Sequence, residues 1–225
     1  MKLVIFDVDG TLVDSQNIIV AAQHMAFAAV GLPPPTREQA LSIVGLSLPE
    51  AFTVLAGADG PIEELVQAYK EGFGALRADP ANAEPLFPGA LSCLEALQGR
   101  DDVLLGIATG KSRRGVIRLL EQHGWHDVFA TIQTADDAPS KPHPAMIHQA
   151  MRETGAEAQD TVMVGDSSFD MAMARAAGVL PLGVSWGFQP IEALVAAGAG
   201  HIVHSYGELD RALGHFLAQP SPSAA

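Results

Sequence analysis

Short apolar runs recur along the chain, and a helical pattern separates each run from the next. Strands that alternate with helices in this way are typical of an α/β fold with a parallel sheet and helices on both faces. Near-continuous apolar character, as in 162–164, suits strands that are buried on both sides. We predict strands at Leu3–Phe6, Val103–Ala108, Phe129–Ile132, Thr161–Val164, Leu180–Val184 and His201–Val203.

One long interval breaks this alternation, because residues 15–85 have helical patterns and no convincing strand. A structureless loop of this length is implausible in a compact domain. We therefore predict a helical cap over 15–85, inserted into an α/β core of residues 1–14 and 86–218. The Pro/Ser/Ala-rich tail, 219–225, is predicted to be disordered. The four predicted cap helices begin with a capping hydroxyl or a proline at Ser15, Thr36, Pro49 and Pro61.

The first predicted strand ends in two acids, Asp7 and Asp9, followed by Gly10. Ligands bind at the carboxyl ends of strands in open α/β sheets. Gly10 allows the chain to leave the strand, so that both acids can face one crevice. Two close carboxylates repel each other unless a cation lies between them, and Mg²⁺ prefers oxygen ligands. An ordinary acidic turn is the alternative explanation of this motif.

Three further motifs follow predicted strands or lie in rigid turns. Thr109 and the backbone N–H of Gly110 could hold a phosphate oxygen at a helix N-terminus, although a plain helix cap is an alternative. Lys141, in a proline-rich turn, could neutralise a phosphate or hold a carboxylate nucleophile in place, or it could be a surface lysine. Asp166 and Asp170, four residues apart, add carboxylates suited to Mg²⁺. Helix capping accounts for one of these two acids but not for the pair.

The composition limits the partners that the chain can have. Its formal net charge is −13, which repels nucleic acid and anionic membranes. We expect no membrane-spanning segment, and no signal peptide because the first predicted strand begins directly after Met1-Lys2. The lone cysteine, Cys93, cannot form an intrachain disulfide. We expect a cytoplasmic protein that binds neither nucleic acid nor membranes, and the sequence leaves open whether it is a monomer or a homodimer.

Together and in this order, the four motifs resemble those of the haloacid-dehalogenase-like (HAD) superfamily. The resemblance covers nearly the whole chain, from Leu3 to about Val203, and residues 6–15 are especially similar to phosphoglycolate-phosphatase-like members. It implies a Rossmann-like parallel sheet core and an inserted α-helical cap of the first type. Within the cap, a stretch that resembles the substrate-specificity loop of those members contains Gly45, Leu46 and Ser47.

The resemblance also implies roles for the acidic residues. Asp7 is the expected nucleophile, which forms an aspartyl-phosphate. Mg²⁺ is expected to be ligated by Asp7, by the backbone carbonyl of Asp9 and by Asp166. The side chain of Asp9 then stays free to protonate the leaving alcohol and to activate water. Asp170 is expected to position the metal shell or Lys141.

Three further residues, Thr109, Gly110 and Lys141, are expected from the resemblance to stabilise charge on the transferring phosphoryl group. Because haloacid dehalogenases lack an acid at the position of Asp9, its presence indicates phosphoryl transfer. The expected function is hydrolysis of a small phosphorylated metabolite, either phosphoglycolate-like or a sugar phosphate.

The sequence leaves two alternative functions possible and does not decide the role of one residue. A phosphomutase resembling β-phosphoglucomutase has the same core, and a non-catalytic binding module is possible on any fold. His24, on the first cap helix, is a candidate substrate contact or a partly buried structural histidine.

Overall fold

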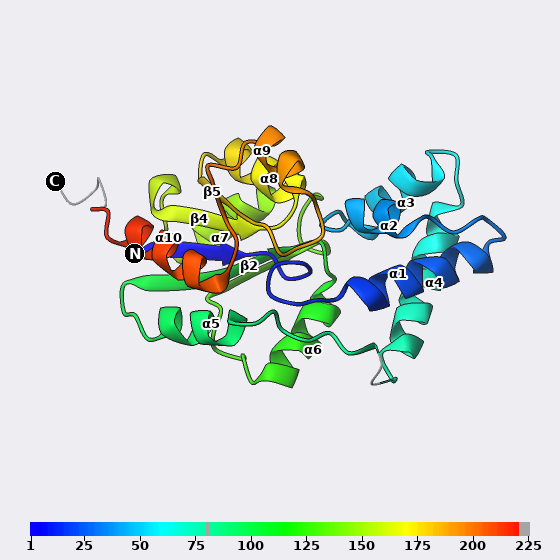
Figure 1. Cartoon of the computed structure of the whole chain (residues 1–225), viewed down its shortest axis with the longest axis horizontal. Helices are drawn as coiled ribbons and strands as arrows, with labels where there is room; N and C mark the ends of the chain where they lie inside the picture. The colour runs from blue at the N-terminus through cyan, green and yellow to red at the C-terminus, as the bar shows by residue number, and fades with distance from the viewer. Residues whose placement is uncertain (80–81, 221–225) are drawn as a thin grey trace.

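The computed structural model describes residues 1–79 and 82–220. Figure 1 shows two regions side by side, an α/β core and a separate group of helices. The predicted tail falls largely outside the described residues, because 221–225 are not among them.

The core contains one six-stranded sheet, and all of its strand pairs are parallel. The strand order is β3-β2-β1-β4-β5-β6, so the order reverses between β1 and β4 and leaves a crevice at their carboxyl ends. This confirms the predicted α/β, Rossmann-like fold. The strands are β1 (Lys2–Phe6), β2 (Val103–Thr109), β3 (Thr131–Thr134), β4 (Thr161–Gly165), β5 (Leu180–Val184) and β6 (His201–Val203).

The predicted start of the third strand at Phe129 is wrong, because β3 begins at Thr131. Phe129 is buried in the turn before the strand, where its ring lies 6.1 Å from that of Trp125. Its apolar character therefore reflects core packing rather than strand pairing.

Helices cover both faces of the sheet. Side chains of β1 alternate, so that Leu3 and Ile5 pack on one face while Val4 and Phe6 pack on the other. The first face is covered by α7 (Ala145–Thr154) and α8 (Ser168–Ala177). The second face is covered by α5 (Ala90–Gln98), α6 (Arg113–His123) and α10 (Tyr206–Leu217), and the short α9 (Ile191–Ala196) follows β5.

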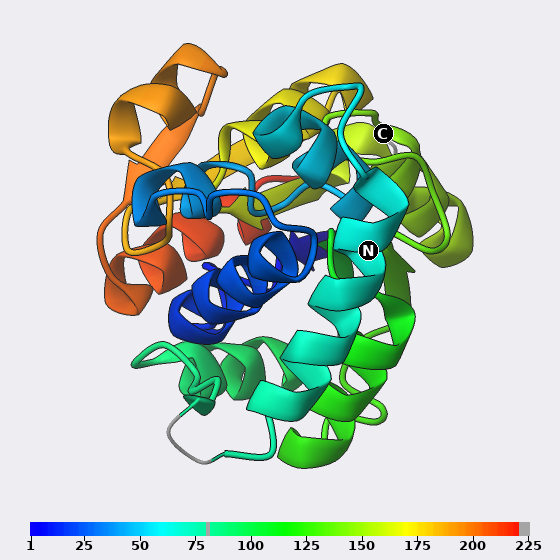
Figure 2. The same ribbon diagram turned by 90° about the vertical axis from the view of Figure 1, so that its right-hand side faces the viewer.

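The described part of the interval predicted as a cap contains four α-helices, which lie in front of the core in the view of Figure 2. They have a small core of their own, formed by Ala26, Phe27, Phe52 and Leu65. The boundaries of the cap at residues 15 and 85 stay predictions. The helices are α1 (Gln16–Ala29), α2 (Arg37–Ser42), α3 (Leu48–Ala56) and α4 (Ile62–Leu76).

Two of the predicted helix starts can be compared with the caps that form. Thr36 caps α2 in a capping box with Gln39, as its sequence position suggests. The predicted capping by Ser15 is wrong, because its side chain makes no cap hydrogen bond to α1. The hydroxyl of Ser15 instead donates to the carboxylate of Asp9.

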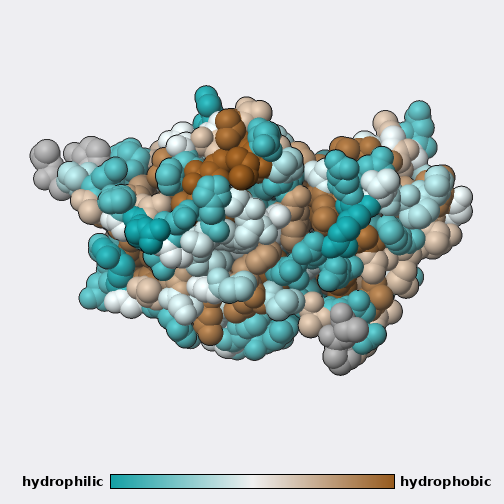
Figure 3. All heavy atoms as spheres, viewed as in Figure 1, coloured by the Kyte–Doolittle hydropathy of each residue, from teal (hydrophilic) through white to brown (hydrophobic). Residues whose placement is uncertain are grey.

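The surface of the view in Figure 3 is mostly hydrophilic, with an apolar patch over the region of α9, where Ile191 and Val195 are exposed. Among residues 1–79 and 82–220, no helix has the length and apolarity needed to cross a membrane.

The small core of the cap generates a stability prediction. Leu65 is fully buried in it, so Leu65→Ala should lower the free energy of unfolding by about 3 kcal/mol through lost burial and an unfilled cavity. Val54→Ala on α3 is the matched control, because Val54 is 64% exposed and should change stability by less than about 0.5 kcal/mol. Urea unfolding measures both, and equal effects would contradict the cap core.

Candidate active site

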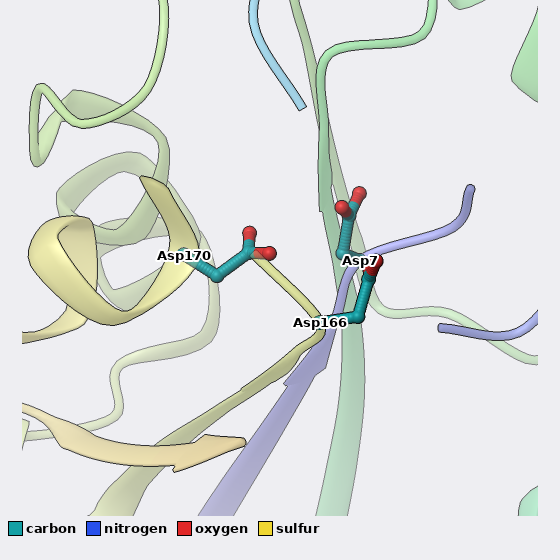
Figure 4. Close-up of side chains that lie close together, drawn as sticks. All are labelled: Asp7, Asp166 and Asp170. Atoms are coloured by element: carbon teal, nitrogen blue, oxygen red, sulfur yellow. The ribbon is translucent and has the colours of Figure 1, made fainter. Parts of the chain in front are cut away.

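Three buried carboxylates meet at the crevice where the strand order reverses. Asp7 follows β1, Asp166 follows β4, and Asp170 lies in the first turn of α8. β1 and β4 pair directly, which brings the ends of these strands together. One carboxylate oxygen from each acid lies within 4.8 Å of the others, and Figure 4 shows the three side chains gathered at the ends of the two strands. The structure thus brings together acids that are more than 150 residues apart in the chain.

A single cation, Lys141, lies among these acids. Its Nζ is 3.0 Å from Oδ1 of Asp7 and 2.6 Å from Oδ1 of Asp170, and its side chain is fully buried. Burial alone lowers the pKa of Lys141, but the charges of the two carboxylates outweigh this effect and raise it. Lys141 is therefore a buried, protonated member of the site and not a surface lysine.

The pKa values of two of these acids are raised despite this lysine. Burial raises the pKa of Asp7 to about 7, with Lys141 acting in the opposite direction and the charge of Asp170 adding to the rise. Burial and the charges of Asp7 and Asp170 also raise the pKa of Asp166 well above its usual value. Three carboxylates against one ammonium group leave a deficit of positive charge, and oxygen donors of this kind fit a Mg²⁺ ion.

The hydrogen bonds of these acids show which carboxylate oxygens are already engaged by protein donors and which acid is better able to ligate a metal. Both oxygens of Asp170 are engaged, Oδ1 by Lys141 and Oδ2 by the N–H (3.1 Å) and hydroxyl (2.6 Å) of Ser167. Asp170 is thus suited to hold Lys141 rather than to bind a metal directly. Among the described residues, each carboxylate oxygen of Asp166 accepts one hydrogen bond. Oδ1 accepts from the hydroxyl of Thr11 (2.9 Å), and Oδ2 accepts from the N–H of Phe188 (2.8 Å).

Two glycines let the backbone approach Asp166 closely. Gly10 has φ +87°, and a Cβ there would lie 2.2 Å from Oδ2 of Asp166. A Cβ on Gly187 would lie 2.1 Å from the Cβ of Asp166. The sequence analysis identified Gly10 but missed Gly187 and the N–H of Phe188. Their position three and four residues after a predicted strand was the only signal in the sequence.

The carboxylate of Asp9 is outside this acidic cluster. It accepts hydrogen bonds from Nζ of Lys111 (2.8 and 3.1 Å) and from the hydroxyl of Ser15 (2.7 Å). Lys111 also pairs with Glu84 at 3.1 Å, in the segment that returns from the cap to the core. The sequence analysis missed Lys111 and Glu84 as site residues, although Lys111 directly follows the predicted pair Thr109-Gly110.

The cap rests directly on the predicted phosphate-binding turn. A Cβ on Gly110 would lie 2.6 Å from the carbonyl oxygens of both Gly45 and Leu46. The N–H of Ser47 donates to the hydroxyl of Ser140 at 2.8 Å. Through these contacts the cap loop that contains Gly45, Leu46 and Ser47 packs directly against the core.

A cavity of about 430 Å³ lies between the cap and the core. Six of the predicted site residues line it: Asp7, Asp9, Thr109, Gly110, Gly45 and Leu46. Ser47 and His24 do not line it. His24 is exposed, and its Nε2 lies 3.0 Å from the carbonyl oxygen of Pro35.

The similarity to known proteins extends over nearly the whole chain. The chain is 36% identical to a phosphoglycolate phosphatase of Chromobacterium violaceum over 93% of this chain and 95% of that protein. It is 32% identical to the pyrophosphatase PpaX of Bacillus pumilus, over 86% and 88% of the two chains. A haloacid dehalogenase-like family hydrolase of Streptococcus pneumoniae has the same fold, with a TM-score of 0.81, 29% identity, and coverage of 96% of this chain and 98% of that one. The family model for haloacid dehalogenase-like hydrolases matches residues 4–184, and together with the parallel sheet and the acidic cluster this match shows that the chain belongs to that family.

Proposed function

We propose that this chain is a Mg²⁺-dependent phosphatase that hydrolyses a small phosphorylated metabolite through an aspartyl-phosphate on Asp7. The observation that carries the proposal is the position of Asp7, which lines the cavity while Lys141 and Asp166 lie behind it. The phosphatase names of the two relatives support the same class of reaction.

Asp7 is held in an orientation suited to nucleophilic attack. Its Oδ1 accepts the N–H of Val8 at 2.7 Å and pairs with Lys141. The carboxylate attacks phosphorus, the bond from phosphorus to the ester oxygen breaks, and an acyl phosphate forms on Asp7. Water then attacks the same phosphorus, which releases inorganic phosphate and restores the carboxylate.

Asp9 serves as the proton carrier in both steps. It lines the same cavity as Asp7, so it can donate a proton to the departing ester oxygen and later accept one from water. Its carboxylate is held by Nζ of Lys111 and by the hydroxyl of Ser15, so Asp9 must loosen these contacts to reach the leaving group. The hydroxyl of Thr109 and the N–H of Gly110 lie at the same end and would donate to the phosphoryl oxygens.

Asp7, Asp166 and the backbone carbonyl of Asp9 would hold the metal. When bound, Mg²⁺ offsets the negative charge that the phosphoryl group and Asp7 bring together. Lys141 and Asp170 keep Asp7 oriented, and the cap loop limits the access of water.

The nucleophile is tested by Asp7→Asn. This substitution keeps the shape of the side chain but removes the attacking oxygen anion, so phosphate release in Mg²⁺ should fall by at least roughly a thousandfold. Asp59→Asn, at an exposed position of the cap, is the control and should leave turnover unchanged. A malachite-green assay with a panel of phosphate esters measures both variants. Substantial activity in Asp7→Asn would exclude the covalent route.

The buried acids predict an unusual dependence of stability on pH. In metal-free protein Asp7 holds its proton up to about pH 7, whereas an unfolded chain releases it near 3.8. The folded state binds more protons in this window, so the free energy of unfolding should fall as pH rises from about 4 to about 7. Mg²⁺ binds the ionised carboxylates and should restore about 2.7 kcal/mol when present at a hundredfold excess over its Kd.

Urea unfolding in EDTA and in Mg²⁺ across this window tests the prediction. Asp7→Asn should have a shallower pH slope than the wild type, and Asp166→Asn should gain less stability from Mg²⁺. Identical slopes in the wild type and Asp7→Asn would show that Asp7 ionises normally. A lack of any Mg²⁺ effect would remove the metal from the proposal.

A further inference from the structure

Positive charge is concentrated at one part of the cavity. The chain has 13 lysines and arginines against 26 acids, yet five of these cations line the cavity that contains Asp7. They come from two helices and the turn before α6: Lys70, Arg77, Lys111, Arg114 and Arg118. Three acids, Asp7, Asp9 and Asp136, also line this cavity, so cations outnumber acids there although acids outnumber cations in the whole chain. This local excess of positive charge suits an anionic ligand.

Two of the five cations already have acidic partners. Arg77 pairs with Glu84 at 2.5 Å, and Lys111 pairs with Asp9 and Glu84. Within residues 1–79 and 82–220, no salt bridge engages Lys70, Arg114 or Arg118. Arg114 and Arg118 are one helical turn apart and therefore lie on the same side of α6. All three are exposed to solvent, which puts them at the mouth of the cavity.

The wall between the reacting end and this mouth is largely apolar. Tyr69 and Phe73 of α4 line it, together with Ile43, Leu46 and Leu48 from the cap loop and its neighbours. The part of the cap loop that lines the cavity contributes no charged side chain. The volume of about 430 Å³ lies in the range that holds organic ligands of substantial size, so the cavity has room for more than a two-carbon leaving group.

We propose that the substrate of this site is a phosphomonoester whose leaving group has an apolar or planar body and carries a second anionic group, which Arg114 and Arg118 bind at the cavity mouth with help from Lys70. This inference rests on the phosphatase function proposed above and specifies its substrate class. The phosphate lies at Asp7, the body of the leaving group lies along the Tyr69 and Phe73 wall, and the second anion lies at α6. A carboxylate and a second phosphate-type group share this chemistry.

Three aryl phosphates with matched bodies test the inference. They are 4-carboxyphenyl phosphate, 4-(phosphonomethyl)phenyl phosphate and the neutral 4-carbamoylphenyl phosphate. With Mg²⁺, the wild-type enzyme should have a higher kcat/KM for the better of the two anionic esters than for the carbamoyl ester. We expect a difference of roughly fivefold or more, because two partly exposed charge pairs contribute about that much. The carbamoyl phenol is a better leaving group than the carboxyphenol, so a preference for the carboxylate cannot come from leaving-group ability.

The assigned residues are tested by the double variant R114Q/R118Q. In this variant the ratio of kcat/KM between the preferred anionic ester and the carbamoyl ester should fall to about one, mainly through KM. The control is R152Q/R211Q, which removes the same charge from exposed positions that do not line the cavity and should keep the wild-type ratio. Added salt should reduce the wild-type preference, because exposed charges are screened.

Each outcome separates this inference from the proposed function. Hydrolysis of all three esters at similar efficiency, lost in Asp7→Asn, overturns the second-anion site and leaves the phosphatase standing. A preference that survives in R114Q/R118Q, or that falls equally in R152Q/R211Q, overturns the assignment to α6. Activity on the panel of phosphate esters without hydrolysis of these three would overturn the second-anion site alone, and no hydrolysis of any ester in either set would overturn both proposals. The preferred anionic ester identifies the second group as carboxylate or phosphate-type.

Discussion

The ammonium group of Lys141, enclosed between Asp7 and Asp170, is the interaction on which the site depends. Without it, three carboxylates would meet in a dry crevice with no positive charge, and burial would drive them to their protonated forms. With it, Asp170 and Asp7 each pair with a buried ammonium group, and this contact would orient Asp7 as the proposed nucleophile. The fold provides space for this arrangement, because the reversal of strand order between β1 and β4 leaves a crevice at the carboxyl ends of these strands.

A second ionic network connects the core to the cap. Lys111 of the core contacts both Asp9 and Glu84, and Glu84 in turn pairs with Arg77 at the end of α4. The proton carrier proposed for catalysis is therefore in electrostatic contact with the segment through which the chain leaves the cap. The basic residues Arg114 and Arg118 of α6 line the same cavity. We propose that charge at the sheet edge binds the phosphate and that charge at the mouth of the cavity binds a second anion.

The fold was largely predictable, and so were the residues of the acidic cluster. The apolar runs are long and buried on both sides, so they identify the parallel strands with little ambiguity, except where Phe129 packs in a turn. Each of the four motifs follows a predicted strand or lies in a proline-rich turn. The sequence therefore predicts that the motifs lie near the carboxyl edge of the sheet. Ser15 was misjudged because a hydroxyl before a helix has two possible partners, the helix backbone and Asp9, and local sequence does not decide between them.

The order of residues along the chain fixed the α/β class, the helical insertion and the identity of the acids, because these follow from local periodicity and strand ends. Contacts between distant segments required the folded molecule. Such contacts place Lys141 between Asp7 and Asp170. They also bring the N–H of Phe188 within hydrogen-bond distance of Asp166, and they bring Gly110 close to the backbone of the cap loop. They also gather Lys70 of α4 and Arg118 of α6 at one cavity. Local patterns carry no record of such pairings, because tertiary packing brings together residues that are far apart in the chain.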